Sequence, residues 1–190
     1  MKLALSIIVV VFTLITIYFF VLGYLSKKGS PIGLVDSRLA QCEQKPNCVC
    51  SEYPDDHAHF VLPLTLPLSS DGSLPPSSAA NLDVAAAALK HSPEDIIRIA
   101  KEAILAMGGK VQPVDDSQRG ASFYLAATFQ STLFGFVDDV ELRVDSQDYR
   151  LHFRSASRVG HSDFGANLKR IEKLKNTISA RLAEDLLVDS

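Results

Sequence analysis

An uncharged apolar run near the amino terminus is the strongest constraint on how this chain can fold. From Leu3 to Leu25 it reads LALSIIVVVFTLITIYFFVLGYL, without a charged residue in 23 positions. As an α-helix the run measures about 34 Å, more than a hydrocarbon layer about 30 Å thick. A signal peptide has a shorter apolar region, of about 7–15 residues, and then a small-residue cleavage site. The sequence therefore predicts an uncleaved, single-span membrane anchor, which with its flanks covers residues 1–28.

The rest of the chain is long enough for one globular domain. Of the 190 residues in the sequence, about 160 remain once the anchor is set aside, enough for one hydrophobic core. The net charge is −3 at pH 7. Binding of nucleic acid requires a concentrated basic footprint, so nucleic acid is not expected as a partner.

Two signals disagree about the side of the membrane on which this domain lies. More lysines and arginines follow the span than precede it, which by the positive-inside rule favours the cytoplasm. All three cysteines, however, crowd into the irregular segment CEQKPNCVC at residues 42–50. A disulfide can close around such a turn, and disulfides persist in oxidising compartments. We expect a single-pass protein of the inner membrane with a periplasmic, extracytoplasmic domain.

The residues after the anchor divide into an extended segment and a core domain. Residues 29–91 are expected to be extended, with the cysteine turn and the proline- and serine-rich connector SSDGSLPPSSAAN. The core domain, residues 92–188, begins at SPED, which combines a serine cap, a proline in the first turn and two acids favoured by the helix dipole. A second helix is expected at residues 163–186.

Alternating apolar residues between these two helices predict β-strands. The strands are expected at residues 110–115, 120–130, 136–145 and 149–157. The predicted fold class is α+β: a transmembrane helix, then a small domain with an antiparallel sheet of three to four strands covered on one face by two helices.

Two adjacent aspartates stand in the middle of one predicted strand, FGFVDDVELRVD at residues 134–145. Aspartate is depleted in strands, and a buried carboxylate costs free energy unless it is paired. The apolar residues of this strand and the next must share the buried face, which turns Asp138 inward and Asp139 outward. Two registers remain open. They differ in the facing pairs, which are Asp138–Ser155 and Asp139–Arg154, or Asp138–Ser157 and Glu141–Arg154.

This parity leads to a hypothesis about the loop SASRVGHSDFGAN, residues 155–167. Asp138 is expected to anchor the loop by bonding its serine hydroxyls, its backbone N–H groups or Arg158. Asp139 is expected on the outer face, within a charged cross-strand lattice. Each pair in this lattice is expected to contribute modestly to stability, ~0.2–1 kcal/mol. Replacing Asp138 by alanine should then lower stability by ~1–3 kcal/mol, and replacing Asp139 much less.

Four segments together are similar to a known family. CEQKPNCV, HFVLPL, LFGFVDDVEL and FRSASRVGHSDFGANLKRIE resemble the bacterial and plastid family catalogued as domain of unknown function 1499, from about Leu39 to Ile178. The resemblance implies a small domain often attached to, or exported across, a membrane, and no established activity. Where the family has serine this chain has Cys50, which implies that Cys42 pairs with Cys48. Where the family has tyrosine, this chain has His161.

A metal site is the alternative interpretation of the cysteine segment. Thiolates and imidazoles follow one another as C-x5-C-x-C-x6-H-x-H, ending at His57 and His59. Such ligands can bind zinc or copper(I), but the spacing matches no standard structural zinc motif. The disulfide is preferred, and no metal or cofactor is expected.

Hydrolysis is the alternative function. It would use Ser155 or Ser157 as nucleophile and His161 as base. The third member would be Asp138, Asp139 or Asp163. The serines lie within a predicted strand, without the G-x-S-x-G turn that exposes a nucleophile. Hydroxyl bonding across the sheet is the simpler interpretation, and no residue is expected to be catalytic.

Anion binding is the remaining possibility. Arg154, Arg158 and Asn167 are expected near the start of the last helix, where free backbone N–H groups attract phosphate or carboxylate. Nearby aspartates could instead neutralise the arginines. We expect a non-catalytic binding or assembly module, with an anionic lipid headgroup or an envelope protein as partner. The candidate ligand-binding or loop-anchoring residues are Asp138, Asp139, Arg154, Ser155, Ser157, Arg158, Asp163 and Asn167.

Overall fold

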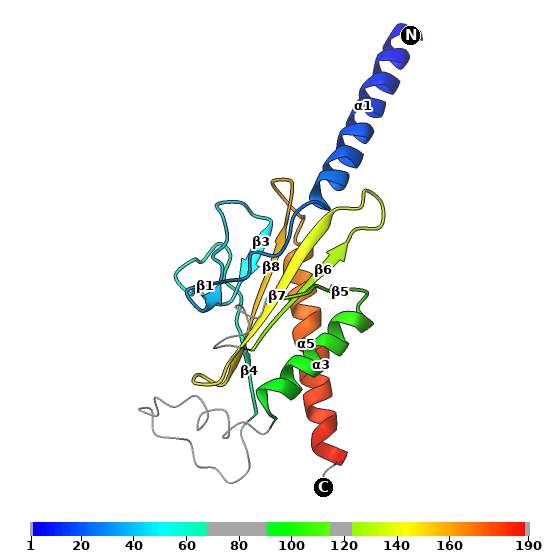
Figure 1. Cartoon of the computed structure of the whole chain (residues 1–190). Coiled ribbons are helices and arrows are strands. Elements are labelled where there is room, and N and C mark those ends of the chain that lie inside the picture. The colour runs from blue at the N-terminus through cyan, green and yellow to red at the C-terminus, as the bar shows by residue number, and fades with distance from the viewer. Residues whose placement is uncertain (1, 68–90, 115–122, 189–190) are drawn as a thin grey trace.

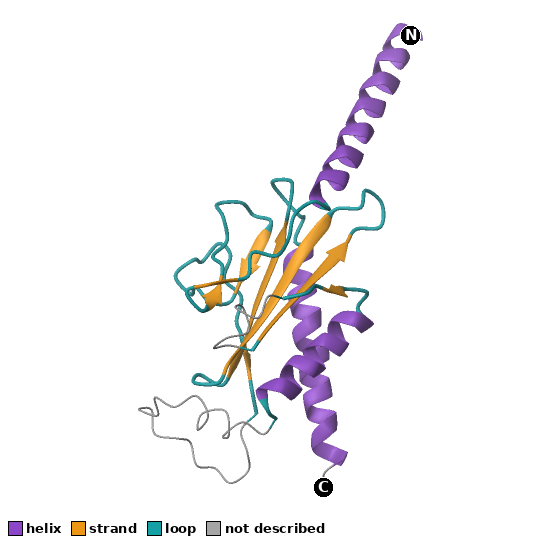
Figure 2. Cartoon of the chain, viewed as in Figure 1, coloured by secondary structure: helices purple, strands orange, loops and turns teal. Residues whose placement is uncertain are grey.

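The computed structural model describes residues 2–67, 91–114 and 123–188. The predicted connector, residues 69–81, lies outside these ranges. The described residues form a long amino-terminal helix followed by a sheet, with two helices on one face of the sheet and an irregular segment on the other (Figure 1, Figure 2).

Helix α1, Lys2–Ser26, projects away from the rest of the chain (Figure 1). Its side chains are largely exposed, and its two buried residues, Gly23 and Ser26, lie at its end. Among the described residues it is the one helix long and apolar enough to cross a membrane. The predicted apolar run is thus one continuous helix.

The sheet is antiparallel throughout, with the strand order β3-β8-β7-β6-β5, and β4 also pairs with β8. The strands are β3 Cys48–Cys50, β4 Leu64–Thr65, β5 Lys110–Val111, β6 Tyr124–Gln130, β7 Val137–Asp145 and β8 Arg150–Ser157. The α+β class and the four predicted strands are confirmed, but the sheet has six strands rather than three to four. The additional strands, β3 and β4, have two or three residues each, too few to show an alternating pattern.

The pairing of β7 with β8 decides between the two registers. Asp138 lies opposite Ser157, and Glu141 lies opposite Arg154. This is the second of the two predicted registers. It places Asp138 on the helix-covered face and Asp139 on the other face.

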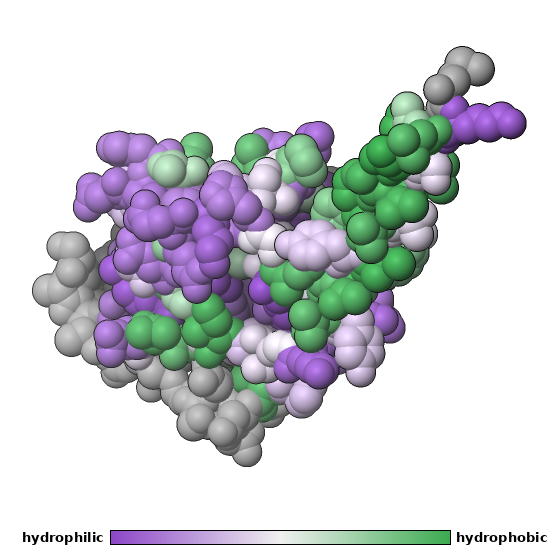
Figure 3. All heavy atoms as spheres, turned by 90° about the horizontal axis from the view of Figure 1, so that it is seen from above, coloured by the Kyte–Doolittle hydropathy of each residue, from purple (hydrophilic) through white to green (hydrophobic). Residues whose placement is uncertain are grey.

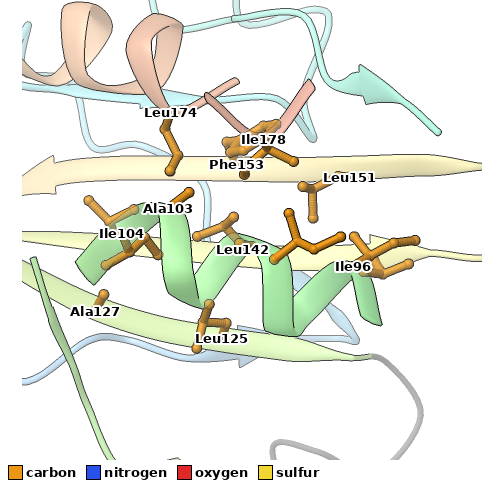
Figure 4. Packing of buried hydrophobic residues seen from close by; sticks show 14 of the residues in the cluster. Ile96, Ala103, Ile104, Leu125, Ala127, Leu142, Leu151, Phe153, Leu174 and Ile178 are labelled. Carbon is orange, nitrogen blue, oxygen red and sulfur yellow. The ribbon is translucent and has the colours of Figure 1, made fainter. Parts of the chain in front are cut away.

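The main core lies between the sheet and helices α3, Pro93–Ala106, and α5, Ala166–Val188. Ser92 caps α3 by accepting a hydrogen bond from the backbone N–H of Asp95 at 3.1 Å, as SPED predicts. In Figure 4 helix side chains meet strand side chains across this core, and the labelled ones are Ile96, Ala103, Ile104, Leu174, Ile178, Leu125, Ala127, Leu142, Leu151 and Phe153.

The second face of the sheet is also covered. Residues 33–53 cover it: β1 Leu34–Val35 and β2 Arg38–Leu39 lie in the part that packs over it, and β3 pairs with β8 at its edge. Leu39 and Cys50, which are 0% and 2% exposed, join Tyr124 and Ala126 of β6 in a second apolar cluster. Part of the segment expected to be merely extended therefore belongs to the packed structure. The division at residue 91 stays a prediction.

This covering corrects the expectation of an exposed charged lattice. Glu141 is fully buried, and Arg154 is 4% exposed. Charged residues are rarely buried unless they are paired. For this reason the alternation of charged residues in β7 and β8 predicts an outer face of the sheet. Here they are paired, and an irregular segment without periodicity lies over them.

The disulfide implied by the family resemblance is present. Cys42 and Cys48 are bonded, with Cα atoms 5.7 Å apart, and Cys50 is a buried free thiol. The bonded pair cannot supply thiolate ligands, and the described residues hold no group of three or more potential metal-ligating side chains. Burial raises the pKa of the Cys50 thiol to about 11.

Candidate functional site

A cavity of about 320 Å³ lies close to the end of α1. We call it the anchor-proximal cavity. Its walls come from the linker after α1, the cysteine turn, and the ends of β7 and β8 with the loop that follows, and they include Gly29, Lys45, Asn47, Asp139, Arg154 and Arg158. Figure 3 views the protein from the end at which α1 leaves and shows the apolar surface of α1 beside a mainly hydrophilic surface.

Arg154 brings a buried guanidinium to this cavity. Its Nη1 donates to Glu141 Oε2 at 2.7 Å. Glu141 Oε1 accepts two further hydrogen bonds, from Tyr124 Oη at 2.6 Å and from Gly33 N at 2.8 Å. Burial, together with the Glu141 carboxylate, raises the pKa of Tyr124, which stays a neutral donor. Both oxygens of the Glu141 carboxylate thus accept hydrogen bonds.

The Nε–H of Arg154 has no such partner. It is buried, and it makes no hydrogen bond to any of the described residues. A buried donor without an acceptor costs about 1–3 kcal/mol, so native structures rarely leave one. Within the part of the chain that the structure describes, a side chain with an unpaired buried donor therefore lines the anchor-proximal cavity.

Arg158 forms a second part of the cavity wall and connects it to α1. Its Nε and Nη2 donate hydrogen bonds to the two carboxylate oxygens of Asp139, with distances from 2.6 to 3.0 Å. Its Nη1 donates to the carbonyl oxygen of Ser26, the last residue of α1, at 3.2 Å. The end of the apolar helix, the loop after β8 and strand β7 are therefore held together by one side chain.

The cysteine turn closes the cavity on the opposite side. Asn47 Nδ2 donates to the carbonyl oxygen of Gly160 at 2.9 Å, joining the turn to the loop after β8. Lys45 and Glu43 form an exposed ion pair of 2.6 Å at the rim. The Cys42–Cys48 bond constrains the turn between them. Asn47 is thus tied into the wall by a hydrogen bond, whereas the ion pair at the rim is exposed.

Asp138 does anchor neighbouring structure, but through a partner that the sequence did not indicate. Its Oδ2 accepts from Arg170 Nη2 of α5 at 2.6 Å. Arg170 Nη1 donates to Ser155 Oγ and to Asn167 Oδ1, and Asn167 Nδ2 donates to Ser157 Oγ and to the carbonyl oxygen of Asn47. Arg158, one of the partners expected for Asp138, binds Asp139 instead, because it leaves β8 on the other face of the sheet.

The loop residue Asp163 acts as a helix cap. Its carboxylate accepts from the backbone N–H groups of Gly165 and Asn167 at 3.0 and 2.7 Å. Helix α5 accordingly begins at Ala166 rather than at residue 163. Phe164, between cap and helix, has a φ of +53° and is 93% exposed.

Most of the predicted residues separate onto opposite faces of the sheet, and Ser157, at the end of β8, both lines the cavity and bonds to Asn167. Arg154, Arg158 and Asp139 line the cavity, whereas Asn167 bonds on the helix-covered face. The predicted convergence of Arg154 with Asn167 at the start of the last helix is therefore wrong. Neighbouring positions on a strand point to opposite faces, and Asn167 follows the parity of the serines to which it bonds.

The hydrolase alternative has no assembled catalytic group. Ser155 is fully buried, and its Oγ bonds to Asn167 and Arg170. Ser157 Oγ accepts from Asn167. In the part of the chain that the structure describes, neither hydroxyl bonds to His161, which is exposed. The simpler interpretation, in which the hydroxyls stabilise the structure, accounts for these contacts.

A second buried polar cluster joins two members of the predicted charged lattice, Arg143 and His152, to Glu52, which the sequence did not indicate. The fully buried carboxylate of Glu52 accepts from Arg143 Nε and Nη2 at 2.7 and 3.1 Å. Burial alone would raise the pKa of Glu52, but the Arg143 hydrogen bond and nearby positive charge outweigh it and lower that pKa. Beside them His152 Nδ1 lies 3.1 Å from Ser51 Oγ, and burial lowers the pKa of this histidine. The alternation of charge in β7 and β8 was the available signal, whereas Glu52 stands in no pattern.

Comparison with curated proteins finds no match. The family described as protein of unknown function, DUF1499, matches residues 38–178. This region contains the cysteine turn, the sheet and both helices of the main core up to Ile178. It begins after α1 and the linker, and it spans 141 of the 190 residues. The chain therefore belongs to the DUF1499 family of proteins of unknown function.

Proposed function

We propose that this protein is a non-catalytic binding module of the cell envelope, anchored in the inner membrane by α1, and that its anchor-proximal cavity binds an anionic group. The phosphate of an anionic lipid headgroup is the ligand that best fits this position. The observation that carries the proposal is the buried, unpaired Nε–H of Arg154 on a side chain that lines a cavity next to the end of an apolar helix.

The packing at the end of α1 supports an anchor that is retained rather than cleaved. Ser26 Oγ accepts from the backbone N–H of Val137 at 3.0 Å. Gly23 meets the loop before β7 so closely that a Cβ at this position would lie 1.8 Å from Phe134 O. Cleavage of α1 would remove these contacts. A signal peptide is removed from the mature protein and does not need to pack against the folded domain.

The Cys42–Cys48 disulfide supports an extracytoplasmic domain, because such bonds persist in oxidising compartments. It also shapes the cavity, since the turn that it closes carries Lys45 and Asn47. An environment that oxidises the cysteines thereby stabilises the binding site.

Each cation at the cavity already has a carboxylate partner, so a bound anion would add to these ion pairs or displace one of the carboxylates. Arg158 is committed to Asp139, and Arg154 uses Nη1 for Glu141. The pair of Lys45 with Glu43 is exposed, with side chains 49% and 75% accessible, and such pairs are worth about 0–1 kcal/mol. Lys45 can leave Glu43 at little cost and contact a ligand bound in the cavity beside Arg154.

Calorimetric titration of the full chain in non-ionic micelles tests this proposal. The probes are dihexanoyl phosphatidylglycerol, zwitterionic dihexanoyl phosphatidylcholine, and inorganic phosphate. We expect the anionic lipid to bind and the zwitterionic lipid to give no saturable heat. Binding of inorganic phosphate alone would assign the same site to a soluble phosphate ligand.

Three variants locate the site. Lys45→Gln and Arg154→Lys should each weaken binding about tenfold, because each removes a hydrogen bond to a charged group, worth about 1.5–3 kcal/mol. Arg154→Lys keeps a positive charge near Glu141 and removes the guanidinium Nε. Lys110→Gln, which removes the same charge from an exposed position on β5, is the matched control. If Lys45→Gln and Arg154→Lys bound the anionic lipid as tightly as the control Lys110→Gln, the proposed site would be refuted.

A further inference from the structure

The loop between β6 and β7, residues 131–136, lies against the last turns of α1. The ring of Phe134 is 5.2 Å from that of Phe19 and 5.3 Å from that of Phe20, measured between centroids. Phe136 adds a contact of 6.2 Å to Phe19. In Figure 1 this loop rises beside the lower end of α1, at the end of the sheet from which the helix leaves.

These contacts determine how deep the loop reaches if α1 spans a bilayer. A hydrocarbon layer about 30 Å thick corresponds to about 20 helical residues. Counted from Leu3, where the uncharged run begins, 20 residues extend to Leu22. Phe19 and Phe20 therefore lie within the hydrocarbon or at its boundary. A loop whose ring packs on both must reach the same depth.

The composition of the loop suits an apolar environment. It reads STLFGF, without charge, and Leu133 at its tip is 70% exposed. Several of its polar groups are satisfied within the loop. The Ser131 N–H donates to Phe136 O, the Gly135 N–H to Ser131 O, and the Phe136 N–H to Ser131 Oγ, with distances from 2.8 to 3.2 Å. Internal bonding of this kind is what backbone requires where water is scarce.

The loop and the end of the helix together form a groove beside these contacts. It has a volume of about 570 Å³ and is lined by Phe20, Tyr24, Lys27, Leu133 and Phe134, among others. Aromatic and aliphatic side chains form one part of the lining, and the lysine ammonium lies just beyond the end of the apolar run. An acyl chain against the rings with a phosphate near Lys27 matches this arrangement. Tyrosine and lysine at such a boundary are typical of the membrane interface.

We propose that the β6–β7 loop is a second membrane-inserted element, which enters the leaflet on the side of the domain and holds a lipid against α1. This inference rests on the proposed anchoring of α1 in a membrane. Two inserted elements in rigid contact restrict how the domain tilts, and they keep the anchor-proximal cavity beside the headgroups.

Tryptophan fluorescence provides the test, because the sequence contains no tryptophan. Three single variants of the full chain are placed in phosphatidylcholine bilayers with or without brominated acyl chains. Leu133→Trp reports on the loop. Leu62→Trp is the matched control, since Leu62 is 69% exposed and its carbonyl oxygen is bonded by Lys175 of α5. Ile15→Trp reports on α1.

We expect brominated lipid to reduce the emission of Leu133→Trp at least twofold, with a blue-shifted maximum, and to leave Leu62→Trp unchanged. Ile15→Trp should be quenched at least as strongly as Leu133→Trp. If Ile15→Trp is quenched and Leu133→Trp behaves like Leu62→Trp, the inserted loop is refuted and the anchor stands. If none of the three is quenched, the proposed membrane anchor fails as well.

Discussion

Replacing Asp139 by alanine should destabilise the domain more than replacing Asp138, the reverse of the order expected from the sequence. Asp139 is 5% exposed, and its carboxylate binds Arg158 through two nitrogens. Without it the Arg158 side chain, 10% exposed, keeps only the carbonyl oxygen of Ser26 as a bonding partner among the contacts described. Removing one partner from a buried ion pair costs about 3–5 kcal/mol, because an uncompensated charge stays buried.

Asp138→Ala is the matched control. The carboxylate of Asp138 is 13% exposed and, among the contacts described, accepts one hydrogen bond, from Arg170. Arg170 would keep its bonds to Ser155 and Asn167. The cost should therefore be about 1–3 kcal/mol, the usual penalty for leaving one buried hydrogen-bonding group unpaired.

Urea unfolding of the full chain in non-ionic micelles, followed by circular dichroism, measures both effects. The midpoint should shift while the denaturant slope stays constant, which identifies a change of stability rather than of the unfolded state. In a double-mutant cycle with Arg158→Met, the Asp139→Ala/Arg158→Met variant should be less destabilised than the sum of the single variants by at least about 2 kcal/mol. A cost below about 1 kcal/mol for Asp139→Ala, or additive single variants, would refute the reasoning.

Three further predictions concern pH, topology and the cysteines. Because burial lowers the pKa of His152 from its ordinary value of 6.5, its neutral form contributes stability above pH 6.5 that is lost as the pH falls towards the lowered folded-state pKa. His152→Gln should flatten the decline of unfolding free energy between pH 7 and 5, and parallel curves for the two proteins would contradict this. Alkaline phosphatase fused after Ser190 should be active in a bacterial host, whereas an inactive phosphatase with a fluorescent cytoplasmic reporter at the same point would place the domain in the cytoplasm. Mass spectrometry should find Cys42 bridged to Cys48, and Cys50, buried and with its pKa raised to about 11, should resist alkylation at pH 8 until urea unfolds the chain. Rapid alkylation of the native protein would contradict its burial.

Local patterns were enough for the regular elements. The apolar run predicted α1, the SPED cap predicted the start of α3, and alternation predicted β6, β7 and β8. Each of these signals repeats over several residues or uses a cap with its own hydrogen bond. Strands β3 and β4, with two or three residues each, offer no such repetition, and the sequence interpretation missed their pairing with β8.

Sequence reasoning named several residues of the candidate site and, in one of its two registers, the Glu141–Arg154 pair, but not the partners of the two aspartates. Arg154, Arg158 and the two aspartates were all identified as candidates, and strand parity correctly separated Asp138 from Asp139. The partner of each aspartate depends on which side of the sheet a distant arginine reaches. Arg170 lies 32 residues from Asp138 along the chain, and no local pattern relates the two.

The sequence by itself determined the apolar helix, the α+β class, the membership of residues in each face of the sheet, and the family. These properties depend on the periodicity of neighbouring side chains and on motifs read in order. Only the tertiary structure decided that the charged face of the sheet is buried, because residues 33–53 cover it and supply Gly33 N and Glu52 to its charges. It alone also placed the unpaired Nε of Arg154 on a side chain lining a cavity and brought the β6–β7 loop to α1. Burial and contact are properties of segments far apart in the chain, and they arise only when those segments pack.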